Sequence, residues 1–177
     1  LQGITRRMAR IIAIANQKGG VGKTTTSVNL AAALALAPKR VLLVDLDAQG
    51  NATMGSGVDK RDLAGSTCDV MLEEMHAADA IVRTPEGFDL LPGNSDLTAA
   101  EIELMDEPGR EQRLRRALEP LRERYDFILV DCPPALSLLT LNALTAADSI
   151  LVPMQCEYYA LEGLSALLQT IDALKAK

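Results

Sequence analysis

The sequence has 177 residues, 48% of them hydrophobic and 24% charged, which is enough for one sizeable core and short for two. Its formal net charge of −6 excludes a globally cationic surface, so binding to nucleic acid or an anionic membrane would need a local patch. Three cysteines in no metal-binding spacing suit a reducing cytoplasm, where we expect core or near-core positions for Cys68, Cys132 and Cys156.

The chain begins with a segment, residues 1–7, that we interpret as a leader or an added remnant before Met8. The pair Arg6-Arg7 precedes an apolar stretch, as in an export signal. That stretch spans only residues 11–15, whereas a signal core needs roughly 7–15 apolar residues and a membrane helix roughly 18. We therefore predict no membrane association and a single domain over residues 8–177.

Short apolar runs then alternate with helical patterns along the chain. The predicted strands cover residues 10–15, 40–44, 88–91, 126–130 and 149–153, and several are apolar at consecutive positions, as in strands buried on both faces. Helical packing stripes follow from the spacing of Leu114, Leu118, Leu121 and Tyr125, and from a leucine-rich stripe over residues 161–174. Pro120 should kink or divide the first of these helices. The alternation predicts an α/β fold, a mostly parallel sheet with helices on both faces.

A glycine-rich segment links the first strand to a long Ala/Leu-rich segment, residues 27–37, in a helix expected to start at Lys23. Backbone N–H groups of such a loop converge at a helix start and favour a polyphosphate. Lys23 can reach β- and γ-phosphate oxygens, the Thr24 hydroxyl can bind Mg²⁺, and Thr25 would face the α-phosphate. Lys18 departs from the usual loop pattern, which asks for no second lysine and would have glycine in place of Gln17. The predicted nucleotide-binding residues are Lys18, Gly19, Gly20, Val21, Gly22, Lys23, Thr24 and Thr25.

Carboxylates follow two further strands, and ligands of such sheets lie at the carboxyl ends of the strands. Mg²⁺ keeps several waters and takes few protein oxygens, so Asp131, after an apolar run, suits a metal site through a water. Of Asp45 and Asp47, which follow the second strand, one is expected at the metal and the other at the attacking water. We predict Thr24, Asp45 and Asp131 at the metal and Asp47 at the water. The lone His76 is expected at the surface, and residues 56–79 as solvated helix and loop.

Several segments in order resemble the ParA/MinD ATPases with a deviant Walker A motif, in detail the Soj-like ParA branch. The motif itself is Lys-Gly-Gly-Val-Gly-Lys-Thr-Thr at residues 18–25. The other similar segments are Asn16-Gln17, residues 44–53, Leu91-Pro92-Gly93-Asn94, Asp131-Cys132-Pro133-Pro134, residues 141–144 and residues 153–163. The resemblance implies a three-layer P-loop NTPase fold with ATP or ADP and Mg²⁺ as cofactors.

The resemblance also implies a switch driven by ATP. In that family ATP lies between two subunits of a homodimer, and the residue matching Lys18 reaches the partner's phosphates, as an arginine finger does. Lys18, Lys23 and Asp47 would then be the catalytic residues. The ATP dimer would bind DNA nonspecifically on the nucleoid, and a ParB-type centromere-binding protein would stimulate hydrolysis and release it. The implied function is segregation of chromosome or plasmid DNA.

Alternatives remain open at this stage. ParA proteins usually continue beyond the point that matches Lys177, so the chain resembles a C-terminally truncated member with weakened ATP affinity and little DNA binding. It could also be a fragment without catalytic competence. A MinD-like membrane-positioning ATPase should end in a basic amphipathic helix, whereas the last stripe here better suits a core. An iron–sulfur carrier of the nitrogenase iron-protein type would need cysteines at a dimer axis, and no partner cysteine matches Cys132.

Overall fold

A six-stranded sheet forms the centre of the computed structural model, which describes residues 8–156 and 160–175, with side chains from residue 164 onward in the last helix. The strands lie in the order β3-β4-β2-β5-β1-β6, and every pairing is parallel except that of β3 with β4. Their bounds are β1 (Arg10–Ile14), β2 (Val41–Asp45), β3 (Val82–Arg83), β4 (Asp89–Leu91), β5 (Phe127–Asp131) and β6 (Ser149–Leu151).

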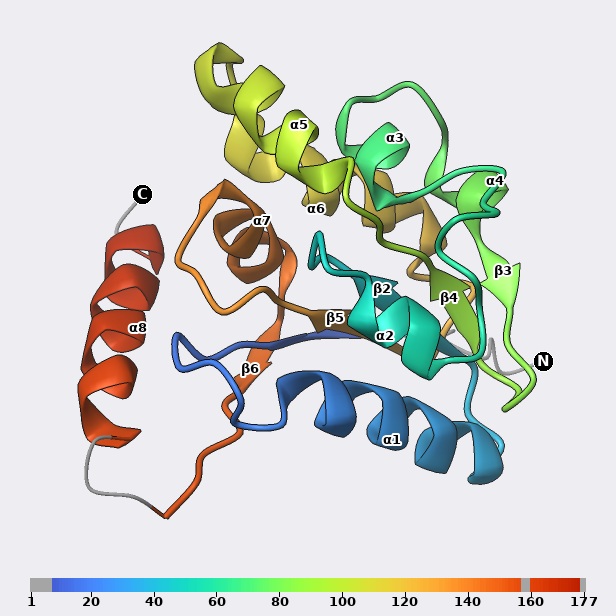
Figure 1. Cartoon of the computed structure of the whole chain (residues 1–177), viewed down its shortest axis with the longest axis horizontal. Helices are drawn as coiled ribbons and strands as arrows, with labels where there is room; N and C mark the ends of the chain where they lie inside the picture. Colours follow the sequence, from blue (N-terminus) through green and yellow to red (C-terminus); the bar gives the residue numbers. More distant parts are fainter. Residues whose placement is uncertain (1–7, 157–159, 176–177) are drawn as a thin grey trace, which may run out of the picture.

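Helices cover both faces of this sheet (Figure 1). The long helix α1 (Lys23–Leu36) and the short α2 (Asn51–Gly55) pack on one face, where Ala31 and Ala52 join a core cluster with Leu43 and Leu129. The other face carries α3 (Thr67–Met71), α4 (Ala77–Ala80), α5 (Leu97–Glu103), α6 (Arg113–Leu118) and α7 (Leu138–Ala146). Single 3-10 turns flank α6 and end α5: η1 (Leu104–Asp106), η2 (Arg110–Gln112) and η3 (Glu119–Leu121). The predicted three-layer α/β fold is confirmed.

The last helix, α8 (Ala160–Lys175), lies beside α7 at the end of the sheet that carries β6 (Figure 1). Leu167 is buried in the larger core cluster, and Ile171 and Leu174 pack against it. The predicted leucine-rich stripe is therefore a packing face where side chains are described. The predictions for three parts of the chain concern positions outside the described residues, namely residues 1–7, the Tyr158-Tyr159 pair and the Leu161 side chain.

The five predicted strands agree with β1, β2, β4, β5 and β6 to within one or two residues, and the helix that contains most of residues 27–37 starts at Lys23 and ends at Leu36. Pro120 ends the regular helix, because α6 stops at Leu118 and Pro120 falls in the 3-10 turn η3. The short β3 was not predicted. The expectation for residues 56–79 is wrong in part, since the capping box of Ser66 and Asp69 starts α3, whose Cys68, Val70 and Met71 are buried. His76 is exposed, as predicted.

Register brings the ends of three strands level. Asp131 at the end of β5 pairs with Ile14 of β1 on one side and with Asp45 of β2 on the other. The glycine-rich loop leaves β1 at this same edge. In the described part of the chain, no helix has the length and apolar character needed to cross a membrane.

Candidate functional site

The glycine-rich loop ends at Gly22, whose φ of 85° lies in the left-handed region that a side chain disfavours. This residue caps α1 in place of a hydroxyl or carboxylate, so the first turn of a 14-residue helix keeps its N–H groups pointed at the loop. Lys23 opens the helix and is only 7% exposed, and its ammonium donates a hydrogen bond to the Lys18 carbonyl at 3.0 Å. The local sequence thus builds an anion site at the end of β1.

Asp131 meets this loop from the neighbouring strand. One carboxylate oxygen accepts a hydrogen bond from the Thr24 hydroxyl at 2.8 Å, and the other accepts one from the Ser27 hydroxyl at 2.7 Å. Burial raises the pKa of Asp131, and these two hydrogen bonds oppose the shift. A threonine hydroxyl beside a buried carboxylate is a donor set that fits Mg²⁺, which binds few protein oxygens and keeps its waters. Thr24 and Asp131 are therefore the residues that could hold the metal.

Ser27 was missed by the sequence analysis. It lies one helical turn after Lys23 and is fully buried, and its hydroxyl oxygen also lies 2.9 Å from the Lys23 carbonyl oxygen. A serine four residues after the loop lysine, on the same helix face, was the available signal. Its bond to Asp131 fixes the carboxylate from the side opposite Thr24.

Electrostatics single out Lys23 as a cation placed among carboxylates. Burial lowers its pKa, while the negative charges of Asp131 and Asp47 raise it. The Lys23 side chain thus lies at a helix start with two carboxylates near enough to act on it. Such an arrangement suits a ligand that carries both phosphate charge and a divalent cation.

A cleft of about 560 Å³ lies over the loop. Seven of the predicted residues line it, together with three that were not predicted, namely Gln49, Asn51 and Pro134. The predicted lining residues are Gly19, Gly20, Gly22, Lys23, Thr24, Thr25 and Asp47. Lys18, Val21, Asp45 and Asp131 lie outside the lining, and Val21 and both aspartates are buried.

Asp45 has different neighbours from Asp131. Its carboxylate accepts hydrogen bonds from the Thr53 N–H and hydroxyl at 2.8 and 2.7 Å and from the Asp47 N–H at 3.1 Å. Burial raises the pKa of Asp45 to about 6 despite these bonds. Its predicted role at the metal stays a prediction, because these contacts connect it to the segment after β2 and not to Thr24.

Two further side chains hold the loop that carries Lys18. The Asn16 carboxamide accepts the Lys18 N–H at 3.0 Å and donates to the Pro153 carbonyl at 2.8 Å. The Gln155 amide donates to the Gly20 carbonyl at 3.2 Å. Both residues fell in segments that resembled the family, but no role had been predicted for them. They attach the phosphate loop to the chain that leaves β6.

A model of a family described as AAA domain, AAA_31, matches residues 9–177. The chain belongs to this AAA_31 family. Among its relatives, Soj of Bacillus subtilis, a sporulation initiation inhibitor protein, is 57% identical over 165 residues, which are 93% of this chain and 65% of Soj. The chromosome partitioning protein ParA of Myxococcus xanthus is 54% identical over 169 residues, covering 95% of this chain and 60% of that protein. The Soj-like ParA resemblance is thereby confirmed.

Solved structures agree with this assignment. A Mycobacterium smegmatis protein named cobyrinic acid a,c-diamide synthase, with bound ADP and magnesium, superposes with a TM-score of 0.92 at 48% identity. That match covers 96% of this AAA_31 chain and 69% of the other. The chain spans 65% of the length of Soj and 60% of the Myxococcus protein.

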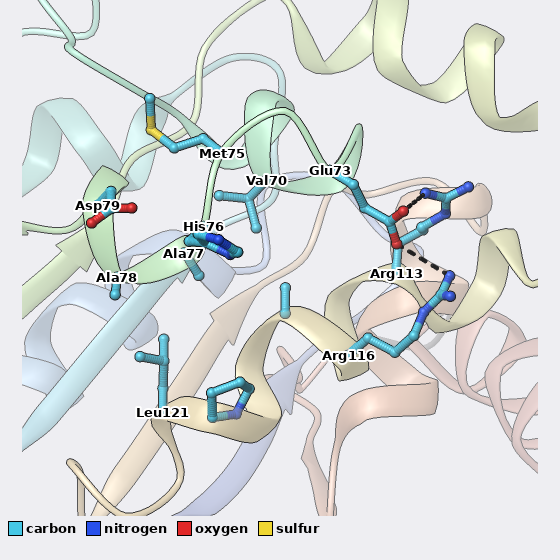
Figure 2. Close-up of a pocket in the computed structure, with 12 residues that line it drawn as sticks. Val70, Glu73, Met75, His76, Ala77, Ala78, Asp79, Arg113, Arg116 and Leu121 are labelled. Atoms are coloured by element: carbon cyan, nitrogen blue, oxygen red, sulfur yellow. Dashed lines mark ion pairs between the residues drawn. The ribbon is translucent and has the colours of Figure 1, made fainter.

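A pocket of similar size, about 540 Å³, lies between α3, α4 and α6 and shares no lining residue with the cleft over the loop (Figure 2). Its wall combines Val70, Ala117 and Leu121 with an ion-pair group, in which the half-exposed Glu73 contacts the mostly buried Arg113 at 2.6 Å and the half-exposed Arg116 at 3.5 Å. Volume therefore does not distinguish the two pockets. The converging loop, the buried lysine and the buried carboxylate make the cleft over the loop the candidate functional site of this AAA_31 domain.

The cysteines contribute nothing comparable in the described residues. Cys68 and Cys132 are buried and Cys156 is exposed, so the core or near-core prediction is wrong for Cys156. Burial raises the pKa of Cys68 to about 11 and that of Cys132 further, which disfavours the thiolate needed to bind a cluster. The described residues thus offer no support for an iron–sulfur carrier.

Proposed function

We propose that this protein is a Mg²⁺-dependent ATPase that acts in partition of chromosome or plasmid DNA. The observation that carries the proposal is the contact of Thr24 with Asp131 beside the buried Lys23, at the level ends of β1 and β5. Bound Mg²⁺ would offset negative charge on the phosphate oxygens. Loop N–H groups and the Lys23 ammonium would bind the phosphates, with Thr24 and Asp131 at the metal. ADP and magnesium in the Mycobacterium structure support this choice of ligand.

Asp47 is the proposed group for the attacking water. It lines the cleft, and its carboxylate accepts the Gln49 N–H at 2.9 Å, which fixes the side chain near the segment that contributes Gln49 and Asn51. A carboxylate held in this way can accept a hydrogen bond from a water and orient it. Lys23 lies close enough to influence Asp47 electrostatically, which keeps the two groups in one site.

Lys18 is proposed to act across a homodimer in which two clefts face each other. Its backbone is fixed by Asn16 through the N–H and by Lys23 through the carbonyl, at the mouth of the loop. A second lysine brought by the partner subunit would stabilise charge that develops on the phosphates, and residues of this kind contribute about 10³–10⁵ in rate in other NTPases. The ATP-bound dimer would bind DNA nonspecifically, and a ParB-type protein would stimulate hydrolysis in the cytoplasm, at the nucleoid.

The partition assignment is preferred to a MinD-like membrane-positioning function because the relatives are named Soj and ParA. A calorimetric titration of the full-length protein with Mg-ATP, followed by its ATP turnover with and without DNA and a ParB-type protein, tests the proposal. We expect binding, slow basal turnover, and stimulation only when both additions are present. Retained binding with no stimulation would refute the partition role, and absence of Mg-ATP binding would refute the ATPase assignment.

A further inference from the structure

The buried carboxylate of Asp45 clamps both ends of one loop. One oxygen accepts the Asp47 N–H at 3.1 Å, and the other accepts the Thr53 N–H at 2.8 Å. The loop between these two points contributes Asp47, Gln49 and Asn51 to the cleft. Asp45 itself is 0% exposed and does not line the cleft, so its influence on the site passes through the loop.

Thr53 extends the clamp to the next strand of the sheet. Its hydroxyl donates to Asp45 at 2.7 Å and accepts the Gly93 N–H at 2.9 Å, in the turn after β4. That turn lies against the clamp, because a Cβ on Gly93 would come within 2.7 Å of the Asp45 carbonyl oxygen. Contacts at the ends of the neighbouring strands β2 and β4 therefore fix the position of the loop.

Besides the Asp45 clamp, the loop is held by the Lys60 ammonium, which donates to the Gln49 carbonyl at 2.5 Å, and by Ala52, which is buried in the core. Helix α2 is five residues long, and Gly50 caps it at a φ of 62° without a side-chain hydrogen bond. Gly50 is also held by close approach, since a Cβ there would lie 2.7 Å from the Gly93 carbonyl oxygen. A short helix with a glycine cap has small intrinsic stability, so its position depends on tertiary contacts.

We propose that Asp45 is a positioning residue that sets the place of the catalytic Asp47 through the Asp47 N–H and, by way of Thr53, through the turn at Gly93. This inference rests on the proposed ATPase function for its catalytic consequence and assigns Asp45 a role other than the predicted one at the metal. Asp131, which contacts Thr24, serves the metal, and Asp45 serves the loop that carries Asp47.

The substitution Asp45→Asn separates these roles. If the carboxamide oxygen takes the place of the oxygen facing Thr53, both Thr53 bonds survive, but the carboxamide NH₂ then faces the Asp47 N–H, and two donors cannot pair. The clamp therefore opens at Asp47 while its other end stays closed. We expect Mg-ATP affinity within about 3-fold of wild type, turnover lower by at least about 10-fold, and an unfolding midpoint no lower than wild type.

Hydrogen exchange provides a test independent of turnover. In the intact protein without nucleotide, amide exchange over residues 47–51 should be faster in Asp45→Asn than in wild type, with exchange of β2 and β5 unchanged. Unchanged exchange over residues 47–51 would overturn the proposal. If exchange is faster in Asp45→Asn but the wild-type protein hydrolyses no ATP, the positioning role of Asp45 is supported and the proposed ATPase function is refuted.

Variants of Thr53 serve as matched controls that do not alter a carboxylate. Thr53→Ser keeps the hydroxyl and should keep turnover within about 3-fold. Thr53→Val removes the hydroxyl bonds to Asp45 and Gly93, while the N–H bond to Asp45 remains, and should lower turnover by at least about 10-fold. If excess Mg²⁺ restores the turnover of Asp45→Asn, Asp45 acts as a metal ligand and the proposal is overturned. Equal loss of ATP affinity, turnover and folding in Asp45→Asn would show a general structural role and overturn it as well.

Discussion

Strands β2 and β5 lie side by side and end level in an aspartate, yet the two ends have different surroundings. Asp131 of β5 bonds to the hydroxyls of Thr24 and Ser27 on α1, whereas Asp45 of β2 bonds to Asp47 and Thr53 of its own outgoing segment. An apolar strand that ends in aspartate thus does not define one chemical role. The hydrogen-bond donors that face the carboxylate distinguish a group placed for a metal from a group placed to hold a loop.

The strongest test of the β5 side is Lys23→Ala, which removes the buried cation beside Asp131. We expect Mg-ATP binding to fall at least about 100-fold, because the phosphates lose their one buried ammonium while two carboxylates remain nearby. Calorimetric titration measures the effect, and Lys39→Ala, at an exposed residue beyond α1, is the control. Binding of wild-type strength in Lys23→Ala would contradict the site.

Asp131→Asn should have the next largest effect on binding. Its two hydroxyl contacts can be kept in part, but the negative charge beside Thr24 is lost, so nucleotide affinity in Mg²⁺ should fall by about 10- to 100-fold. Titrations in Mg²⁺ and in EDTA separate the metal from the nucleotide. If Asp131→Asn weakens nucleotide binding equally in Mg²⁺ and in EDTA, Asp131 has no specific role at the metal. If Asp45→Asn leaves the affinity unchanged in both titrations, the two aspartates have different roles.

Lys18→Gln should leave nucleotide affinity within about 3-fold of wild type and remove turnover and ATP-dependent dimerisation. The physical reason is that the loop backbone at residue 18, which bonds to Asn16 and Lys23, does not require the ammonium. Light scattering with ATP reports the dimer and phosphate release reports turnover. A variant that hydrolyses ATP normally would exclude the cross-subunit role.

The raised pKa of Asp45, at the end of β2, predicts that the stability of the protein depends on pH. The pKa of Asp45 is raised from 3.8 to about 6 in the folded protein, so the native state holds its proton more strongly than the unfolded chain. Stability is therefore favoured below pH 3.8 and falls as pH rises toward 6, by up to about 3 kcal/mol. Asp45→Asn should flatten this slope in urea unfolding between pH 4 and about 7. If the unfolding free energy depends on pH equally in wild type and Asp45→Asn, the raised pKa of Asp45 is contradicted.

The smallest effect is expected far from either strand end, in the pocket of Figure 2. Glu73→Gln weakens ion pairs to Arg113 and Arg116 whose acidic partner is 54% exposed, so unfolding free energy should drop by less than about 1 kcal/mol. Nucleotide affinity should not change. A large loss of Mg-ATP binding in this variant would mean that the pocket and the phosphate cleft are coupled.

Much of the fold was predictable because its signals are local. Five strands appear as apolar runs, and Pro120 stops α6 since it lacks an N–H for the helical ladder. Strand β3 escaped prediction because two residues carry no periodicity, and its pairing with β4 is a tertiary contact. The burial of α3, in a segment expected to be solvated, was not predicted for a similar reason, since the buried Thr67 hydroxyl donates to the Pro92 carbonyl, far along the chain.

The residues of the candidate site also include some that local sequence predicts and others that it does not. The phosphate loop could be predicted from the order of its residues, because Gly22 needs a left-handed φ and Lys23 and Thr24 follow it at the start of a helix. Which carboxylate meets Thr24, which one clamps the Asp47 loop, and the support from Ser27, Asn16 and Gln155 became known from long-range contacts. Strand order and register place these partners far along the chain from one another, and no local pattern encodes which donors will face a buried carboxylate.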